Sequence, residues 1–165
     1  MKVAIIYYSK TGRTEYVANI LAQKLREQNI NVDLYKLEPY RDYFDKLLHI
    51  NPRLVYDTLI KKKAKIKKLQ GFNPDNYDII VIGTPIWFNT MTPIVRSFIE
   101  EFRGKISKPI ICFTTSNLPL DYAGRFKEAL KSMGYNIILY FGISRPENEV
   151  DKIDKIVNFI KEKLK

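Results

Sequence analysis

The chain has 165 residues, 45% hydrophobic and 28% charged, which fits one ordered domain, residues 1–165, with a full core. Its net charge is +10. The single cysteine, Cys112, lies within an apolar run and argues against a disulfide framework and a multi-cysteine metal site. The single histidine, His49, argues against histidine-based catalysis. No apolar run approaches the ~20 residues of a membrane span, and the N-terminus leads directly into a predicted strand rather than a signal peptide, so we expect a cytoplasmic protein.

Apolar runs and helical patterns alternate along the chain. Because the short runs are apolar at nearly every position, they predict parallel strands that are covered on both faces, in a doubly wound α/β sheet. The strands are expected at Val3–Tyr8, Val32–Lys36, Ile79–Gly83, Ile110–Thr114 and Ile137–Phe141. Helical spacing of apolar residues predicts helices at Arg13–Arg26, Thr92–Phe102, Tyr122–Met133 and Glu149–Leu164.

The pattern is looser between Pro39 and Pro74, where Tyr43–Leu48 and Leu54–Leu69 are expected to be helical. Six lysines fall within residues 61–68, and we interpret them as the solvated face of a helix. A patch for nucleic acid, an anionic membrane or an acidic redox partner is the alternative. The run contains no arginine or aromatic residue, so it does not indicate specific nucleic-acid binding.

The turn between the first strand and the first helix is rich in hydroxyl groups. Its residues are Ser9, Lys10, Thr11, Gly12, Arg13 and Thr14. The start of a helix has backbone N–H groups without partners and the positive end of the helix dipole, and both favour an anion such as a phosphate. A plain capped turn is the alternative. The turn lacks the Gly-Lys-Ser/Thr end of a P-loop and the G-x-G-x-x-G dinucleotide pattern.

Two further segments follow the third and fourth predicted strands. The first contains Thr84, Pro85, Ile86, Trp87, Phe88, Asn89 and Thr90, with the only tryptophan of the chain. An aromatic ring on a loop at this edge could stack on a flat cofactor, with Phe88 as a substitute for Trp87; filling of a hydrophobic corner is the alternative. The second contains Thr114, Thr115, Ser116 and Asn117.

These segments, S-x-T-G-x-T, G-T-P-I-W followed by Met91-Thr92-Pro93, and F-T-T-S-N, resemble in order the three flavin loops of the flavodoxin family. The resemblance covers essentially the whole chain. It implies a five-stranded sheet of order 2-1-3-4-5, with FMN at the carboxyl ends of strands one and three. It further implies that Ser9–Thr14 bind the FMN phosphate, that Thr84–Thr90 hold the ring, and that Thr114–Asn117 border the ribityl chain or the pyrimidine edge.

The chain departs from carrier flavodoxins in two respects. The third loop lacks their stacking aromatic, for which Tyr122 is a distant stand-in, so one ring face is expected to be open. Carrier flavodoxins are typically acidic, whereas the three loops here contain Lys10 and Arg13 and no carboxylate. Positive charge stabilises the reduced, anionic flavin, so we expect a less negative potential than in acidic flavodoxins.

The resemblance leaves the function between two main alternatives. An FMN-binding electron carrier is favoured by the small size and by the absence of a second nucleotide motif. An FMN-dependent oxidoreductase that uses NAD(P)H or a quinone is favoured by the open ring face and the basic surroundings. A flavin-free interaction module is a third reading. The carrier would need a redox partner protein, and the sequence leaves the oligomeric state open.

Overall fold

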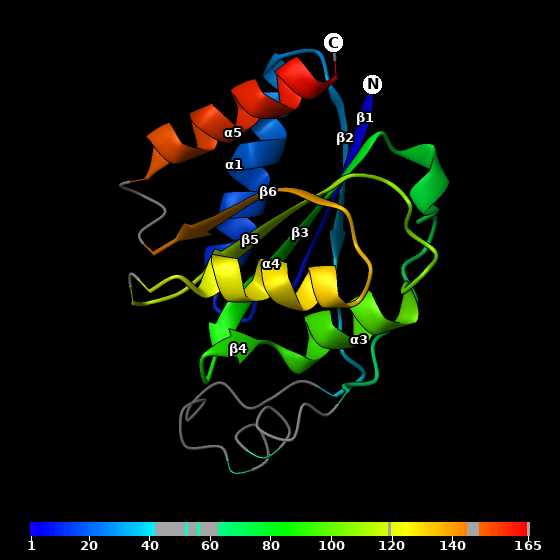
Figure 1. The fold of residues 1–165 in the computed structure, drawn as a ribbon, viewed down its shortest axis with the longest axis vertical. Coiled ribbons are helices and arrows are strands. Elements are labelled where there is room, and N and C mark those ends of the chain that lie inside the picture. Colours follow the sequence, from blue (N-terminus) through cyan, green and yellow to red (C-terminus); the bar gives the residue numbers. More distant parts are fainter. Residues whose placement is uncertain (42–51, 53–55, 57–62, 119, 145–148, 165) are drawn as a thin grey trace.

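The fold is a parallel sheet between two layers of helices (Figure 1). The computed structural model describes residues 1–41, 52, 56, 63–118, 120–144 and 149–164. Five parallel strands have the order β2-β1-β3-β5-β6, and a short strand, β4, pairs antiparallel with β3. Without β4 this is the predicted order 2-1-3-4-5. The strands are β1 (Lys2–Tyr7), β2 (Asn31–Lys36), β3 (Ile79–Trp87), β4 (Thr90–Met91), β5 (Ile110–Thr115) and β6 (Ile137–Ile143).

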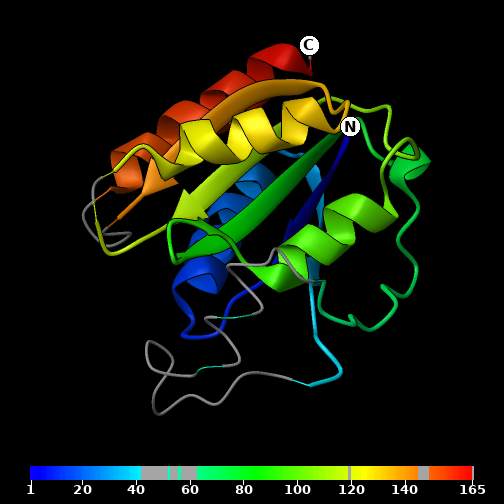
Figure 2. The same cartoon turned by 60° about the horizontal axis from the view of Figure 1, so that its bottom comes forward.

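Two helices cover each face of the sheet. Figures 1 and 2 show α1 (Arg13–Glu27) and α5 (Val150–Lys163) on one face, with α3 (Pro93–Glu101) and α4 (Tyr122–Ser132) on the other. A 3-10 turn, η2 (Pro74–Asn76), precedes β3. The helices predicted at Arg13–Arg26, Thr92–Phe102, Tyr122–Met133 and Glu149–Leu164 are therefore present to within one residue at each end. None of the helices in the described residues is both long and apolar enough to cross a bilayer.

The central strands β1, β3 and β5 are apolar along most of their length because each faces two cores. In β1, Val3 and Ile5 pack into the core beneath α1 and α5, whereas Ala4 and Ile6 pack into the core beneath α3 and α4. Successive strand side chains point to opposite faces, so a strand covered on both sides has no solvent face. Cys112 lies fully buried in the α3/α4 core, as its apolar surroundings predicted.

Two predictions made from the sequence are wrong. β3 does not end at Gly83 but continues to Trp87 and turns back into β4, so much of the expected second loop is a β-hairpin. Residues 63–69 are not helical either: Ile66 forms an antiparallel bridge with Pro39, and the Tyr40 N–H donates to the Lys65 carbonyl at 2.9 Å. The predicted helix Tyr43–Leu48, most of residues 54–62 and His49 lie outside the described residues.

Candidate functional site

The three predicted loops meet at the carboxyl ends of β1, β3 and β5. These strands are neighbours and run parallel, so their ends share one edge of the sheet, beside the β3–β4 hairpin (Figure 2). Hydrogen bonds join the first and third loops across this edge. The Thr14 and Thr115 hydroxyls lie 2.7 Å apart and buried, and Arg13 Nη1 bonds to Asn117 Oδ1 and, at 3.4 Å, to the Ser116 carbonyl.

The first loop forms a polar nest at the start of α1. Gly12 is the N-cap with φ of +86°, a left-handed conformation that favours glycine, and no side chain caps the helix. Ser9 is 8% exposed, and its Oγ has no hydrogen-bond partner, the only such buried side-chain atom among the described residues. A buried hydroxyl without a partner costs about 1–3 kcal/mol. The orphaned donor beside an uncapped helix start fits an anionic ligand.

The second loop is a tight hairpin held by buried threonines. Thr84 is fully buried, where its hydroxyl donates to the Pro85 carbonyl at 2.9 Å and accepts from the Thr92 N–H at 3.3 Å. Phe88 and Asn89, at the turn, both have positive φ, +46° and +63°. Thr84 therefore fixes the hairpin from beneath, and Phe88 and Asn89 present its tip to solvent.

The two aromatic rings of this loop lie in different environments. Trp87 is 8% exposed and meets Tyr8 edge-on, with ring centroids 5.6 Å apart, whereas Phe88 is 37% exposed. Trp87 thus fills the hydrophobic corner beneath the hairpin, and Phe88 is the accessible ring. Stacking of either ring on a cofactor stays a prediction.

Two contacts to the hairpin escaped the sequence analysis. The Tyr122 hydroxyl, from the first residue of α4, donates to Asn89 Oδ1 at 2.9 Å. From α3, Arg96 Nη2 donates to Thr90 Oγ1 at 3.4 Å. Arg96 is 7% exposed, and a charged residue within an otherwise apolar helix face was the only signal in the sequence. The hairpin is therefore held from both helices of one face.

One carboxylate lies close to the nest. Glu15, in the first turn of α1, accepts from the Lys36 ammonium at 2.9 Å and from the Tyr7 hydroxyl at 3.3 Å. Burial, with a further contribution from Glu15, raises the pKa of Tyr7 to about 12. Glu15 is thus paired with a lysine, and Lys10 and Arg13 are the charged residues within the first loop.

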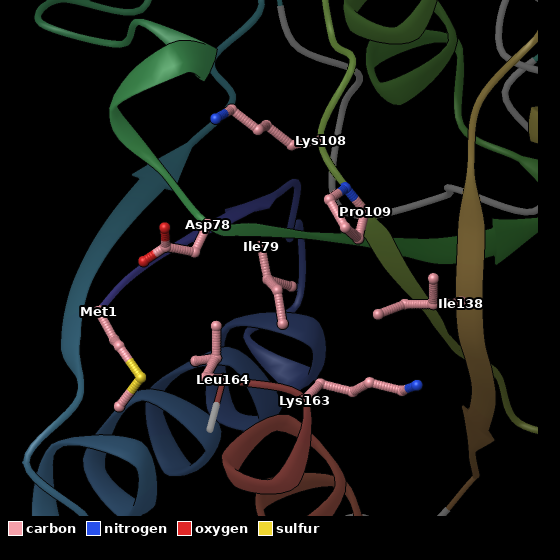
Figure 3. A pocket seen from close by; sticks show the side chains of 8 residues that line it. All are labelled: Met1, Asp78, Ile79, Lys108, Pro109, Ile138, Lys163 and Leu164. Carbon is pink, nitrogen blue, oxygen red and sulfur yellow. The ribbon is translucent and has the colours of Figure 1, made fainter.

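Described residues line a cavity near each end of the strands. One of about 640 Å³ lies at the amino ends, where the ammonium groups of Lys108 and Lys163 point away from each other, so they do not converge on a ligand (Figure 3). Its other lining residues are Met1, Asp78, Ile79, Pro109, Ile138 and Leu164. A smaller cavity of about 280 Å³ borders the third loop and is lined in part by Ser116, Leu118, Leu120 and Lys152. Only the second shares the edge with the three loops.

Known proteins are similar to this chain in sequence and in fold. Among curated proteins, an NAD(P)H dehydrogenase (quinone) of Bradyrhizobium sp. (strain BTAi1 / ATCC BAA-1182) is 29% identical over 110 residues, 62% of this chain and 47% of that protein. A protein of the same name from Rhodopseudomonas palustris (strain TIE-1) is 31% identical over 110 residues, with the same coverage of 62% and 47%. The chain therefore spans about half the length of the curated relatives it matches.

Solved structures share the fold. A flavoprotein in complex with FMN from Lactobacillus acidophilus NCFM is 22% identical, with 93% of this chain and 98% of that chain covered and a TM-score of 0.71. A flavodoxin from the domain Archaea is 16% identical, with 99% and 98% covered and a TM-score of 0.62. The family model described as Flavodoxin matches residues 2–144. Because that match covers most of the chain, the protein belongs to the flavodoxin family, the FMN-binding family that its three loops predicted.

Proposed function

We propose that this chain binds FMN non-covalently at the edge formed by the three loops and carries electrons between redox partners. The observation that carries the proposal is the buried, unpartnered hydroxyl of Ser9 beside the uncapped start of α1. A phosphate at this place would accept a hydrogen bond from Ser9 and from the helix N–H groups. When bound, FMN supplies one- and two-electron redox chemistry, and the protein supplies binding and electrostatics.

The three loops divide the work of holding the cofactor. Ser9–Thr14 would bind the phosphate, the hairpin within Thr84–Thr90 would hold the ring, and Thr114–Asn117 would border the ribityl chain or the pyrimidine edge. Thr84, Thr14 and Thr115 already bond within the protein, so their hydroxyls fix the shape of the site. Phe88 is the aromatic ring at the surface of the hairpin and is available to the flavin or to a partner.

We further propose that the protein acts in the cytoplasm.

An FMN-dependent NAD(P)H or quinone oxidoreductase is the second candidate. It is supported by the curated relatives named NAD(P)H dehydrogenase (quinone), of which this chain spans about half. Leu118 and Leu120, which follow the third loop, have exposed apolar side chains. They would offer an apolar surface to an acceptor near the flavin. The lack of a second nucleotide motif in the sequence favours the carrier.

An anaerobic spectral titration separates these functions. The purified protein is first loaded with FMN, and the bound flavin is then treated with NADH, NADPH and finally dithionite. The carrier predicts a flavin that only dithionite reduces, with a one-electron-reduced form that accumulates on the way. Bleaching by NADPH alone would establish the enzyme, and failure to bind FMN would leave the flavin-free interaction module.

The basic nest makes the potential itself a test. One favourable unit charge at ~10 Å and an effective dielectric constant of ~40 is worth about 0.8 kcal/mol, or tens of millivolts for one electron. Lys10 and Arg13 should therefore make the second reduction of FMN less negative than in acidic flavodoxins. The potential should also fall as salt screens these charges. A second potential as low as that of acidic flavodoxins would contradict this expectation.

A further inference from the structure

Arg96 carries a buried positive charge that forms no ion pair with a described carboxylate. It is 7% exposed, and among the described residues its side chain donates a hydrogen bond only to Thr90 Oγ1, at 3.4 Å. Glu100, one turn further along α3, forms its ion pair with Lys63 instead. Burial lowers the pKa of Arg96, and the charge of Glu100 partly opposes this shift. An arginine remains protonated even so, and the helix therefore holds a permanent, poorly solvated cation.

The position of Arg96 directs this charge toward the hairpin. Arg96 is the fourth residue of α3, which begins two residues after β4. The helix start is the positive end of the helix dipole, and α3 has no acidic residue in its first turn. The electric fields of the guanidinium and of the helix dipole are therefore both positive at Thr90, which lies on the segment assigned to the flavin ring. Two adjacent positive fields with little compensation favour a negative charge across the hairpin.

Reduction of a flavin bound against the hairpin would place a negative charge on its ring. Full reduction adds two electrons and one proton to the ring, supplied by the redox partner and by solvent, so the ring gains one negative charge. We propose that Arg96 raises the potential of the bound flavin by stabilising this charge through the hairpin. Arg96 itself exchanges neither electron nor proton. The inference rests on the FMN binding proposed above.

Arg96 differs from Lys10 and Arg13 in how its charge is screened. Arg13 is exposed at the first loop. Salt screens the field of an exposed charge, with a screening length of ~10 Å at 0.1 M ionic strength. A charge that is 93% removed from solvent is screened much less. The contribution of Arg96 should therefore persist at high salt, where the contributions of the loop charges are lost.

The test compares two pairs of variants, each loaded with FMN, by potentiometric titration at low and high salt. Arg96→Met should lower the equilibrium constant of the second reduction at least tenfold, about 59 mV for one electron, at both salt concentrations. Arg103→Met, its control, removes an exposed charge just beyond the end of the same helix and should change the constant less than threefold. Arg96→Lys keeps the charge and should restore most of the wild-type value.

The second pair decides the matter if Arg96→Met does not fold. Glu100→Gln removes the carboxylate whose charge acts on Arg96, so it should raise the constant more than the exposed neighbour Glu101→Gln. Equal potentials for Arg96→Met and Arg103→Met, or equal shifts for the two glutamine variants, would overturn the inference. FMN binding by the wild-type protein is measured before any variant is compared. Failure of that binding would instead overturn the proposed function.

Discussion

Replacement of Ser9 by alanine should act in opposite directions on the free protein and on its complex with FMN. In the free protein the Ser9 Oγ is buried without a partner. Ser9→Ala removes that unsatisfied group, so the free energy of unfolding should rise, by up to about 1–3 kcal/mol. In the complex the same hydroxyl would donate to the FMN phosphate. A hydrogen bond to a charged group is worth about 1.5–3 kcal/mol, so the dissociation constant for FMN should increase roughly 10- to 150-fold.

Two measurements in phosphate-free buffer test this reversal. Urea unfolding of the free protein gives the stability, and quenching of flavin fluorescence gives the affinity. Riboflavin lacks the phosphate, so its affinity should be the same for Ser9→Ala and for wild type.

Ser97 provides a matched control. It is 7% exposed, and its hydroxyl is satisfied by the Pro93 carbonyl at 2.9 Å. Ser97→Ala should lower stability and leave FMN affinity unchanged, the reverse of Ser9→Ala. A Ser9→Ala protein that is less stable than wild type and binds FMN as tightly would refute the assignment of Ser9 to a phosphate site.

Three further predictions concern other residues. Tyr122→Phe removes the hydrogen bond to Asn89, so FMN should bind more weakly by about 1 kcal/mol in the same titration; unchanged affinity would show that the hairpin keeps its shape unaided. Burial raises the pKa of Cys112 to about 12, so a thiol reagent at neutral pH should label it in urea and not in the native protein. Hydrogen bonds, first from Lys2 and then from Tyr77, hold the pKa of Asp33 below its ordinary value. This stabilisation is fully present above the pKa of the unfolded chain and is lost as the pH falls through the lowered pKa of the folded protein, so the stability advantage over Asp33→Asn should shrink in acid unfolding experiments below about pH 4.

The sequence predicted the sheet and the edge where the candidate site lies, because its central strands are marked by apolar runs that are covered on both faces. It did not predict the β3–β4 hairpin. Two-residue hairpin turns usually carry Asn-Gly or Asp-Gly, and here Phe88 and Asn89 take positive φ without glycine. Tertiary contacts from Tyr122 and Arg96 hold the hairpin, and such contacts are not written in local sequence.

The lysine run shows a second reason for failure. Its spacing fitted a helix, yet the backbone around Ile66 pairs with the segment that follows β2, a partner 27 positions earlier in the chain. Local propensity is a weak guide where such pairing is available. The loop residues of the candidate site could be named from the sequence, but the isolation of the Ser9 hydroxyl could not, since burial depends on the whole edge.

The bond between Thr14 and Thr115 links the start of the site to a strand 101 residues later. A ribosome would synthesise Thr14 101 residues before Thr115, so the nest would exist well before β5 can close it. Closing so long a loop is slow relative to forming α1, so the nest should gain its final shape late in folding. Retention of FMN would then mark chains whose sheet is complete, and truncated chains that end before β5 should release the cofactor even when α1 has formed.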